Sequence, residues 1–546
     1  MKSESMDYSQ LEKYASKTRY ILYVVCQTTV RALALVVPFL TEFLIDSVSS
    51  KDVGLFLNYS IQLLAVNVMY VVLFSLTFYI RVCYEDASIA LKKKEIVNKM
   101  FQMPLSAVQE KGSGYFVQRF SSTVENCRSF LIDKPVNFYI NILYGIGIIL
   151  SMLRINIRYA FFLLIVFPLL AYIYRFLANK IHSVTAEREH LSDKGNSLVE
   201  EAYSCNYTIR TNNSEKWMQS RILSILIPAF RKDREFNKIE TVYDFFLITG
   251  LMNIVTVLVY ILGGYYVFQN TITFGMVVSM SLLFSKLWIP LEFYLDFPKE
   301  RAKYLAHKKR LDELLSYEEA AEIPPRELES FKKLRIENLT YSIGPKPLFE
   351  NLSLELNSGE HVAIYGSNGS GKSTLANFIA AINTDYTGHI FYNGIDYRTL
   401  HPHSVREHIC LIPAKAELFT GTIKENLLLG QSTEIPEAVS ELLSKKGLSL
   451  DFVLQENGSN LSSGESKLLQ LARGFCRNSD LYIIDEPLNF IDQNYSEMIV
   501  SVLDTLFDKK TVIIISHDQR VFHSCTTFYH LDNHLLTKTD DVNVQK

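Results

Sequence analysis

The chain has 546 residues, of which 48% are hydrophobic, and its formal net charge at pH 7 is −3. This length exceeds one ordinary hydrophobic core, so at least two large units are expected. The small net charge argues against nucleic acid as a partner, because nucleic-acid-binding domains present a strongly basic face. The seven cysteines are scattered without a CxxC pair, which predicts neither a disulfide framework nor a zinc site.

Six apolar stretches in the first 300 residues are long enough to cross a bilayer, which requires about 20 residues per helix. They predict an α-helical six-span transmembrane domain over residues 20–315, preceded by a short N-terminal segment at 1–19. The expected spans are 21–44, 59–80, 136–153, 159–174, 245–268 and 271–291.

The distribution of basic residues predicts the orientation of these spans. Nine Lys and Arg side chains lie between residues 81 and 134, whereas one lies in 47–58 and none in 269–270. Because Lys and Arg accumulate on the cytoplasmic side of a membrane, the long basic connections and both termini are expected to be cytoplasmic.

The long basic connections are predicted to continue the spans as helices. Residues 85–103 and 180–202 are rich in helix formers and contain no proline and one glycine, Gly195. Short turns are expected at 104–114 and 205–212. The alternative, a pair of disordered basic tails, conflicts with the apolar content of these segments.

A second domain is predicted after a linker at residues 316–333, which contains Pro324 and Pro325. From residue 334 to the end, short β-branched runs alternate with helical patterns. This alternation is typical of an α/β domain.

A glycine-rich segment follows the predicted strand at 361–365 and precedes a helix-forming stretch. It reads Gly-Ser-Asn-Gly-Ser-Gly-Lys-Ser over residues 366–373, the GxxxxGK[ST] pattern of a phosphate-binding loop (P-loop). Its backbone N–H groups and the helix N-terminus would face phosphates, Lys372 would reach the β- and γ-phosphates, and the Ser373 hydroxyl would bind Mg²⁺.

Three further side chains are predicted at the same sheet edge. An apolar strand ends in Asp485 and Glu486, and another delivers His517. Asp485 would hold Mg²⁺ through water, and Glu486 would orient or deprotonate the attacking water, as phosphoryl transfer requires. His517 would donate a hydrogen bond to the γ-phosphate. The predicted catalytic set is therefore Glu486, His517 and Lys372.

With these motifs the chain resembles the half-transporters of the ATP-binding cassette (ABC) exporter family. Residues 461–465, Leu-Ser-Ser-Gly-Glu, resemble the family's LSGGQ signature, and Asp492 matches its dimer-communication loop. The resemblance implies a P-loop domain with antiparallel β and α-helical subdomains, and ATP and Mg²⁺ as cofactors. It also implies nucleotide contacts from Gly366, Ser367, Asn368, Gly369, Ser370, Gly371, Lys372, Ser373, Thr374, Tyr341, Ser462, Gly464 and Asp492, the signature contacts being made across a dimer.

Three features depart from the family pattern. Ala414 stands where the family has a glutamine that helps to ligate Mg²⁺. Ser463 and Glu465 replace a glycine and a glutamine of the signature. Tyr341 is expected near the adenine, although a shifted alignment places Ile343 at the stacking position. Slow hydrolysis is one expected consequence.

The resemblance implies a multi-pass exporter subunit in a bacterial cell membrane, in contact with membrane lipid and with its domain for ATP in the cytoplasm. Its cargo would be a peptide, a lipid or an amphipathic small molecule. The partner would be a second half-transporter, with a homodimer favoured over a heterodimer. A non-transporting membrane protein that senses nucleotide is the alternative function.

Charged side chains within spans are costly and point to function. Arg31 in the first span and Lys286 in the sixth are candidates to line a cavity and bind a carboxylate or phosphate. The alternative is that each extends its charged end to the membrane interface or pairs with an acid such as Glu42 or Glu292.

Overall fold

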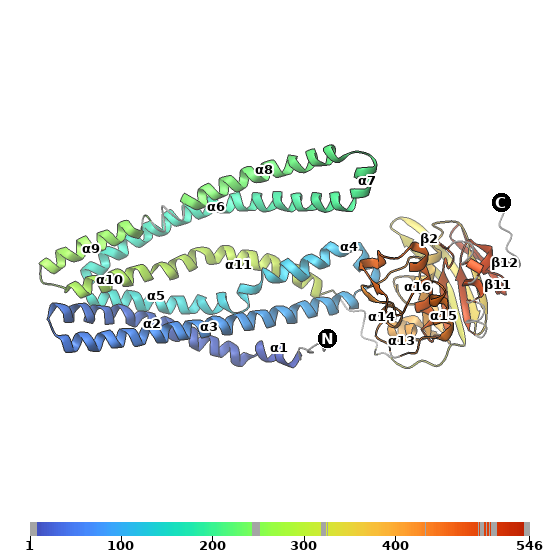
Figure 1. The fold of residues 1–546 in the computed structure, drawn as a ribbon, viewed down its shortest axis with the longest axis horizontal. Helices are drawn as coiled ribbons and strands as arrows, with labels where there is room; N and C mark the ends of the chain where they lie inside the picture. The colour runs from blue at the N-terminus through green and yellow to red at the C-terminus, as the bar shows by residue number, and fades with distance from the viewer. Residues whose placement is uncertain are drawn as a thin grey trace. The chain divides into compact units, whose positions relative to one another are not determined.

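The computed structural model describes residues 8–242, 250, 252–317, 324, 326–431, 433–489, 491, 496–497, 499–501, 503 and 510–539. The chain forms two compact units (Figure 1). The first comprises Met1–Lys99 and Tyr115–Ser316, and the second comprises Met100–Gly114 and Tyr317–Lys546.

The first unit is built from helices, several of them far longer than a bilayer requires. The 50 residues of α3 extend over about 75 Å at the α-helical rise, against a hydrocarbon core of about 30 Å. The helices are α1 (Tyr8–Tyr14), α2 (Lys17–Ser49), α3 (Val53–Gln102), α5 (Asp133–Ile155), α6 (Ile157–Ser204), α7 (Asn206–Thr211), α8 (Glu215–Thr241), α9 (Met252–Phe268), α10 (Phe274–Lys286) and α11 (Trp288–Leu315).

Four helical segments of the described chain are long and apolar enough to cross a membrane: Leu11–Ser49, Val53–Gln102, Asp133–Ile155 and Phe274–Leu315. They contain the first, second, third and sixth predicted spans. The fourth predicted span lies within α6. The fifth is represented by the shorter apolar helix Asn253–Phe268, and residues 245–249 and 251 of that span lie outside the described residues.

The two connections predicted as short turns each contain a helix. The first includes α4 (Leu105–Gln118), which is broken at Gly112, and the second includes α7. Gly112 has a φ of 73°, a conformation that glycine adopts without the steric cost of a Cβ atom.

Close helix packing holds the membrane unit together near the start of α10. The Asp46 carboxylate accepts hydrogen bonds from the Thr273 hydroxyl at 2.7 Å and from the Gly275 N–H at 3.0 Å. A Cβ atom on Gly275 would lie 2.4 Å from the Glu42 carbonyl oxygen, so this approach of α2 and α10 requires glycine. The half-buried aspartate thus satisfies one backbone donor that the start of a helix leaves open.

The strands in the described part of the second unit form three sheets. An antiparallel sheet has the order β2-β1-β4-β5, and a two-stranded sheet pairs β7 with β8. The strands are β1 (Lys333–Ile343), β2 (Lys346–Asn357), β4 (Thr387–Tyr392), β5 (Ile395–Asp396), β7 (Gly421–Thr422) and β8 (Val453–Leu454).

The central sheet has six strands in the order β12-β11-β3-β10-β9-β6. All neighbouring pairs are parallel except β11 with β12. The strands are β3 (His361–Tyr365), β6 (Ile409–Ile412), β9 (Leu481–Asp485), β10 (Thr511–Ile515), β11 (Thr527–Asp532) and β12 (Leu535–Thr539), and the helices of the unit are α12 (Lys372–Ile379), α13 (Pro402–His408), α14 (Ile423–Leu428), α15 (Glu437–Ser444) and α16 (Ser463–Phe475).

The register of this sheet positions the chemistry. Strands β9 and β10 are buried along their whole length, as continuous apolar runs in parallel sheets usually are. Ile515 pairs with Ile364 on one side and with Asp485 on the other. The segments that follow β3, β9 and β10 therefore leave the sheet at one edge, where ligands bind in open α/β sheets.

Candidate nucleotide-binding site

The loop after β3 folds around its own lysine. Lys372 is 8% exposed, and its Nζ donates hydrogen bonds of 2.9 Å to the carbonyl oxygens of Gly366 and Ser367. Gly371 has a φ of 99°, and a Cβ atom there would lie 2.7 Å from the Phe349 ring. Burial lowers the pKa of Lys372, and the nearby carboxylates of Glu486 and Asp485 act in the opposite direction. The loop thus presents a buried cation beside the N-terminus of α12.

Two buried oxygen atoms beside this lysine are arranged for a ligand. Asp485 at the end of β9 is 3% exposed, and its Oδ1 has no hydrogen-bond partner in the described part of the chain; the same holds for the Ser370 hydroxyl. Burial raises the pKa of Asp485, and a hydrogen bond from Ser373 opposes that shift. The Asp485 carboxylate and the Ser373 hydroxyl meet beside the phosphate-binding loop. Together they fit Mg²⁺, which takes one or two protein ligands and completes its shell with phosphates and water.

No group of three or more His, Cys, Asp or Glu side chains that could hold a metal occurs among the described residues. A preformed protein cage for a metal is therefore not seen in that part of the chain. Ser373 and Asp485 suit an ion that arrives with its nucleotide.

Glu486 is held by three neighbours. Its N–H donates to the Ile515 carbonyl at 2.8 Å, although its φ of 49° is uncommon for a residue with a Cβ atom. Its carboxylate accepts a hydrogen bond of 3.1 Å from the Ser516 hydroxyl, and His517 Nδ1 lies 3.0 Å from Oε2. The Glu486 side chain is 12% exposed and that of His517 is 62% exposed. The carboxylate therefore has a fixed orientation, with an accessible imidazole beside it.

The predicted signature lies at the start of α16. The Ser462 hydroxyl accepts a hydrogen bond from the Glu465 N–H at 3.2 Å and donates one of 2.7 Å to Glu465 Oε2, which also accepts from the Ser462 N–H at 2.8 Å. These contacts form a capping box. Hydrogen bonds from the Ser462 N–H and then its hydroxyl lower the pKa of Glu465. The Glu465 carboxylate therefore occupies the start of α16, where the sequence predicts contact with a nucleotide phosphate.

The other predicted contacts are distributed as follows. Tyr341 packs its ring edge-on against Phe378 of α12 with 5.0 Å between ring centroids, whereas Ile343 is 60% exposed at the end of β1. Ser367, Asn368 and Gly369 are exposed, Thr374 lies in the first turn of α12, and Gly464 lies in the first turn of α16. Asp492 lies outside the described residues.

Lys467 is a buried cation that the sequence reasoning missed. It is 1% exposed, and its Nζ donates to the carbonyl oxygens of Pro413 at 3.1 Å, Ala414 at 2.9 Å and Asp485 at 3.3 Å. Burial lowers the pKa of Lys467 to about 8, against the effect of the carboxylates of Asp485 and Glu486. Lysine is rarely buried, so only the fold could reveal this position. The side chain ties the signature helix to the segment that carries Ala414 and to the end of β9.

Comparison with known families gives two matches in this chain. The family described as ABC transporter transmembrane region matches residues 20–290, and the family described as ABC transporter matches residues 349–489.

Among curated proteins, the lactococcin-G-processing and transport ATP-binding protein LagD of Lactococcus lactis subsp. lactis is 26% identical over 464 residues, which cover 80% of this chain and 64% of the relative. An ATP-dependent lipid A-core flippase of Thiobacillus denitrificans is 22% identical over 433 residues, which cover 77% of this chain and 75% of the relative. A solved bacterial Atm1-family ABC exporter with ATP bound has a TM-score of 0.76 at 17% identity and covers 95% of this chain and 94% of its own. This last likeness shows a shared fold.

Proposed function

Because this chain belongs to the ABC transporter family, with a transmembrane region and a nucleotide-binding domain in one polypeptide, we propose that it is one half of an ATP-driven exporter. The observation that carries the proposal is the sheet edge at which Lys372, Asp485 and Glu486 meet. Phosphoryl transfer requires a cation for the phosphates, a carboxylate that can bind Mg²⁺ and a carboxylate that orients the attacking water. Lys372, Asp485 and Glu486 correspond to these three groups.

The residues of this edge divide the chemistry among them. The backbone of residues 366–373 and Lys372 bind the phosphates, and Ser373 and Asp485 hold Mg²⁺, which neutralises developing charge when it is bound. Glu486 orients the attacking water or accepts its proton. His517, fixed through Nδ1 against Glu486, directs its other ring nitrogen toward the γ-phosphate.

The second half of the site comes from a partner subunit. Ser462 and the Gly464 amide of one subunit face the nucleotide held by the other, with Asp492 nearby, in an arrangement that the family pattern supports. We favour two identical copies. The altered signature at Ser463 and Glu465 supports a heterodimer as the other arrangement, in which a different half-transporter supplies the standard signature.

ATP can drive the membrane helices only if it binds one conformation more tightly than the other. Closure of two nucleotide-binding domains around ATP supplies that difference, and hydrolysis reverses it. The transported molecule is a peptide, a lipid or an amphipathic small molecule, and the names of the two curated relatives support the first two classes. The protein is membrane-bound, and we place it in a bacterial cytoplasmic membrane with both termini inside the cell.

Phosphate release by the purified full-length protein tests the proposal. Glu486→Gln keeps the shape of the side chain and removes the base, and we expect the rate to fall at least about 100-fold. Glu434→Gln, at an exposed loop position, is the matched control. Equal rates for Glu486→Gln and the wild type would remove Glu486 from the mechanism.

The same preparation in liposomes distinguishes a pump from a nucleotide sensor. The sensor is the alternative because Ala414 replaces the glutamine that helps to ligate Mg²⁺ in the family. A pump couples ATP turnover to its substrate, so candidate cargo should stimulate phosphate release. Turnover that never responds to cargo while ATP still changes the conformation would favour the sensor.

A further inference from the structure

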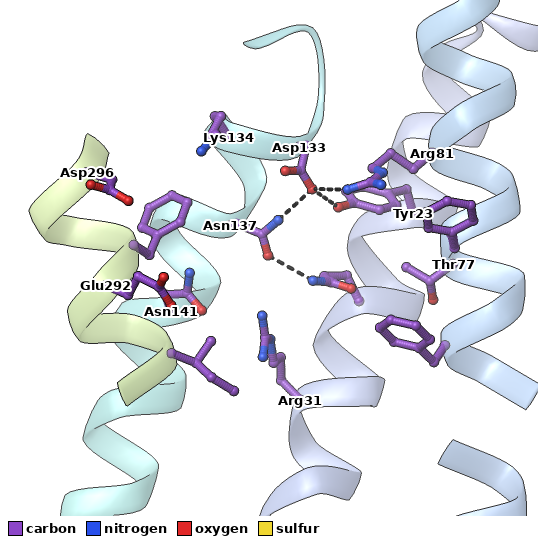
Figure 2. Close-up of a pocket in the computed structure, with 15 residues that line it drawn as sticks. Tyr23, Arg31, Thr77, Arg81, Asp133, Lys134, Asn137, Asn141, Glu292 and Asp296 are labelled. Carbon is purple, nitrogen blue, oxygen red and sulfur yellow. Dashed lines mark hydrogen bonds and ion pairs between the residues drawn. The ribbon is translucent and has the colours of Figure 1, made fainter. Parts of the chain in front are cut away.

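Four helices of the first unit surround a cavity of about 490 Å³ (Figure 2). Its walls come from α2, α3, α5 and α11, at the ends of the spans from which α3 and α11 continue as long helical extensions. Under the predicted orientation, these ends face the cytoplasm. The volume lies within the usual range for sites that bind small molecules.

Two of these helices direct a polar stripe into the cavity. On α2 the lining side chains include Gln27 and Arg31, and on α5 they include Asp133, Asn137 and Asn141. A spacing of four residues places side chains on one face of an α-helix. The polar lining is therefore built into both helices rather than contributed by isolated positions.

Part of this polar lining is satisfied internally. The Asp133 carboxylate pairs with Arg81 at 3.2 Å and accepts hydrogen bonds from Tyr23 at 3.0 Å and from Asn137 at 2.8 Å (Figure 2). Gln27 then donates to the Asn137 side-chain oxygen at 2.8 Å. These groups neutralise and hold one another, so they form the frame of the cavity.

Arg31 stands apart from this frame. It points from α2 into the space between the helices, and its Nε is buried without a hydrogen-bond partner in the described structure (Figure 2). Its guanidinium carbon lies 5.2 Å from the centre of the Tyr144 ring, and the Asn141 Oδ1 is likewise buried and unpartnered. A charged group within a span is costly unless a partner compensates it, so we expect the Arg31 guanidinium to bind an anion.

The opposite wall carries the complementary charge. Glu292 and Asp296 line the cavity from α11, one turn apart, together with the apolar side chains of Ile289 and Phe293 (Figure 2). The remaining cation, Lys134, lies 3.8 Å from Glu300, outside the lining. Two acids beside apolar side chains suit a protonated amine on a partly apolar molecule.

We propose that this cavity binds an amphipathic zwitterion, with its anionic group on Arg31 and its protonated amine on Glu292 and Asp296. The apolar part lies against Phe74, Phe78 and Phe293. The inference rests on the proposed export function and names the substrate class. A short peptide with free ends and an aminophospholipid headgroup share this chemistry.

The structure places the other predicted cavity residue elsewhere. Lys286 is half-buried in α10 and is not among the residues that line the cavity. It is close enough to interact electrostatically with Arg31, but it does not line the cavity. Lys286→Gln removes the same charge as Arg31→Gln, but at a position outside the cavity lining, so it serves as a control variant.

Equilibrium binding of the radiolabelled tripeptide Leu-Phe-Leu to the purified full-length protein without ATP tests the proposal. Four forms are compared: free, N-acetylated, C-amidated and blocked at both ends. We expect each block to weaken binding about ten-fold, the effect of losing one charge-assisted hydrogen bond. Because the charges are changed on the probe, this part of the experiment needs no variant protein.

Variants assign each end of the peptide to a wall. Arg31→Gln should remove the effect of amidation and keep that of acetylation, and Glu292→Gln with Asp296→Asn should do the reverse. Arg31→Lys should restore part of the loss, and Lys286→Gln is the control that should keep both effects.

Competition by short-chain phosphatidylethanolamine, compared with phosphatidylglycerol, tells the two sources apart. Displacement by phosphatidylethanolamine alone identifies a lipid cargo, and peptide binding that neither lipid displaces identifies a peptide.

Equal binding of all four peptide forms would overturn the zwitterion site, as would binding of neither the peptide nor phosphatidylethanolamine. Phosphate release measured on the same preparation separates this failure from that of the export function. A protein that hydrolyses ATP through Glu486 and ignores both probes retains the proposed function and loses the proposed substrate class.

Discussion

Two edges of the nucleotide-binding domain would face ATP, the P-loop and the start of α16, and they differ in how they interact with negative charge. At the P-loop, Lys372 and the start of α12 present a cation and backbone donors, and the buried Asp485 leaves one oxygen without a partner among the described residues. At the start of α16, the Ser462 hydroxyl and N–H already bind the Glu465 carboxylate. One edge is open to phosphate, whereas the other carries an internal anion.

This difference has a simple electrostatic origin. A helix N-terminus favours any negative charge placed on it, whether that charge belongs to a ligand or to a nearby side chain. The P-loop has glycines at this point and lets a phosphate approach. The signature has Glu465, which competes with a phosphate for the same donors. We therefore expect the two edges to respond in opposite directions when their charges are removed.

The largest expected effect is at the P-loop edge. Lys372→Met removes the buried cation, and ATP affinity should fall about 100-fold because a charge-assisted contact to phosphate is lost. Binding of a fluorescent ATP analogue measures it, and Lys538→Met, at an exposed position of β12, is the control. Unchanged affinity would mean that this edge does not bind the triphosphate.

A smaller effect is expected at the side chain that joins the two edges. Lys467→Met leaves three carbonyl oxygens buried without their donor, and the nucleotide-binding domain should lose about 2 kcal/mol of unfolding free energy. Thermal unfolding of the full-length protein measures this loss as a lower Tm, and Lys467→Gln, which keeps one donor, should fall between the two. A Tm equal to or above that of the wild type would show that apolar packing compensates for the lost bonds.

The smallest effect is expected at the signature and has the opposite sign. Glu465→Gln removes the competing charge, so the ATP concentration for half-maximal hydrolysis should fall about three-fold, the size of one charge at a helix terminus. Glu425→Gln is the matched control, because Thr422 and Glu425 form the same capping box at the start of α14. A decrease in both variants, or in neither, would contradict competition at the signature.

The pH dependence of thermal stability provides a second test of the Glu465 carboxylate. The pKa of Glu465 is lowered in the folded protein, so its capping contribution to stability is present above the unfolded pKa and is lost as pH falls through the folded one. The difference in Tm between the wild type and Glu465→Gln should therefore shrink below the ordinary glutamate pKa of about 4.3. A difference that is constant with pH would show that ionisation of Glu465 does not support the cap.

Several features of the protein could be predicted from the chain alone, because each depends on neighbours in sequence. The P-loop is a continuous run of eight residues, and a membrane span is a continuous run of apolar ones. The capping box at Ser462 and Glu465 also has a local S-x-x-E signal, which was interpreted only as a departure from the signature. The content of helix-forming residues likewise predicts the long extensions of the spans.

Contacts between distant segments were decided only by the tertiary structure. The pairing of Arg81 with Asp133, and of Gln27 with Asn137, satisfies part of the cavity lining, whereas the Arg31 Nε has no hydrogen-bond partner among the described residues. Lys467 meets Ala414 and Asp485 only because α16 packs beside the ends of β6 and β9. The cost of a buried charge depends on which groups surround it, and those groups come together only when the chain folds.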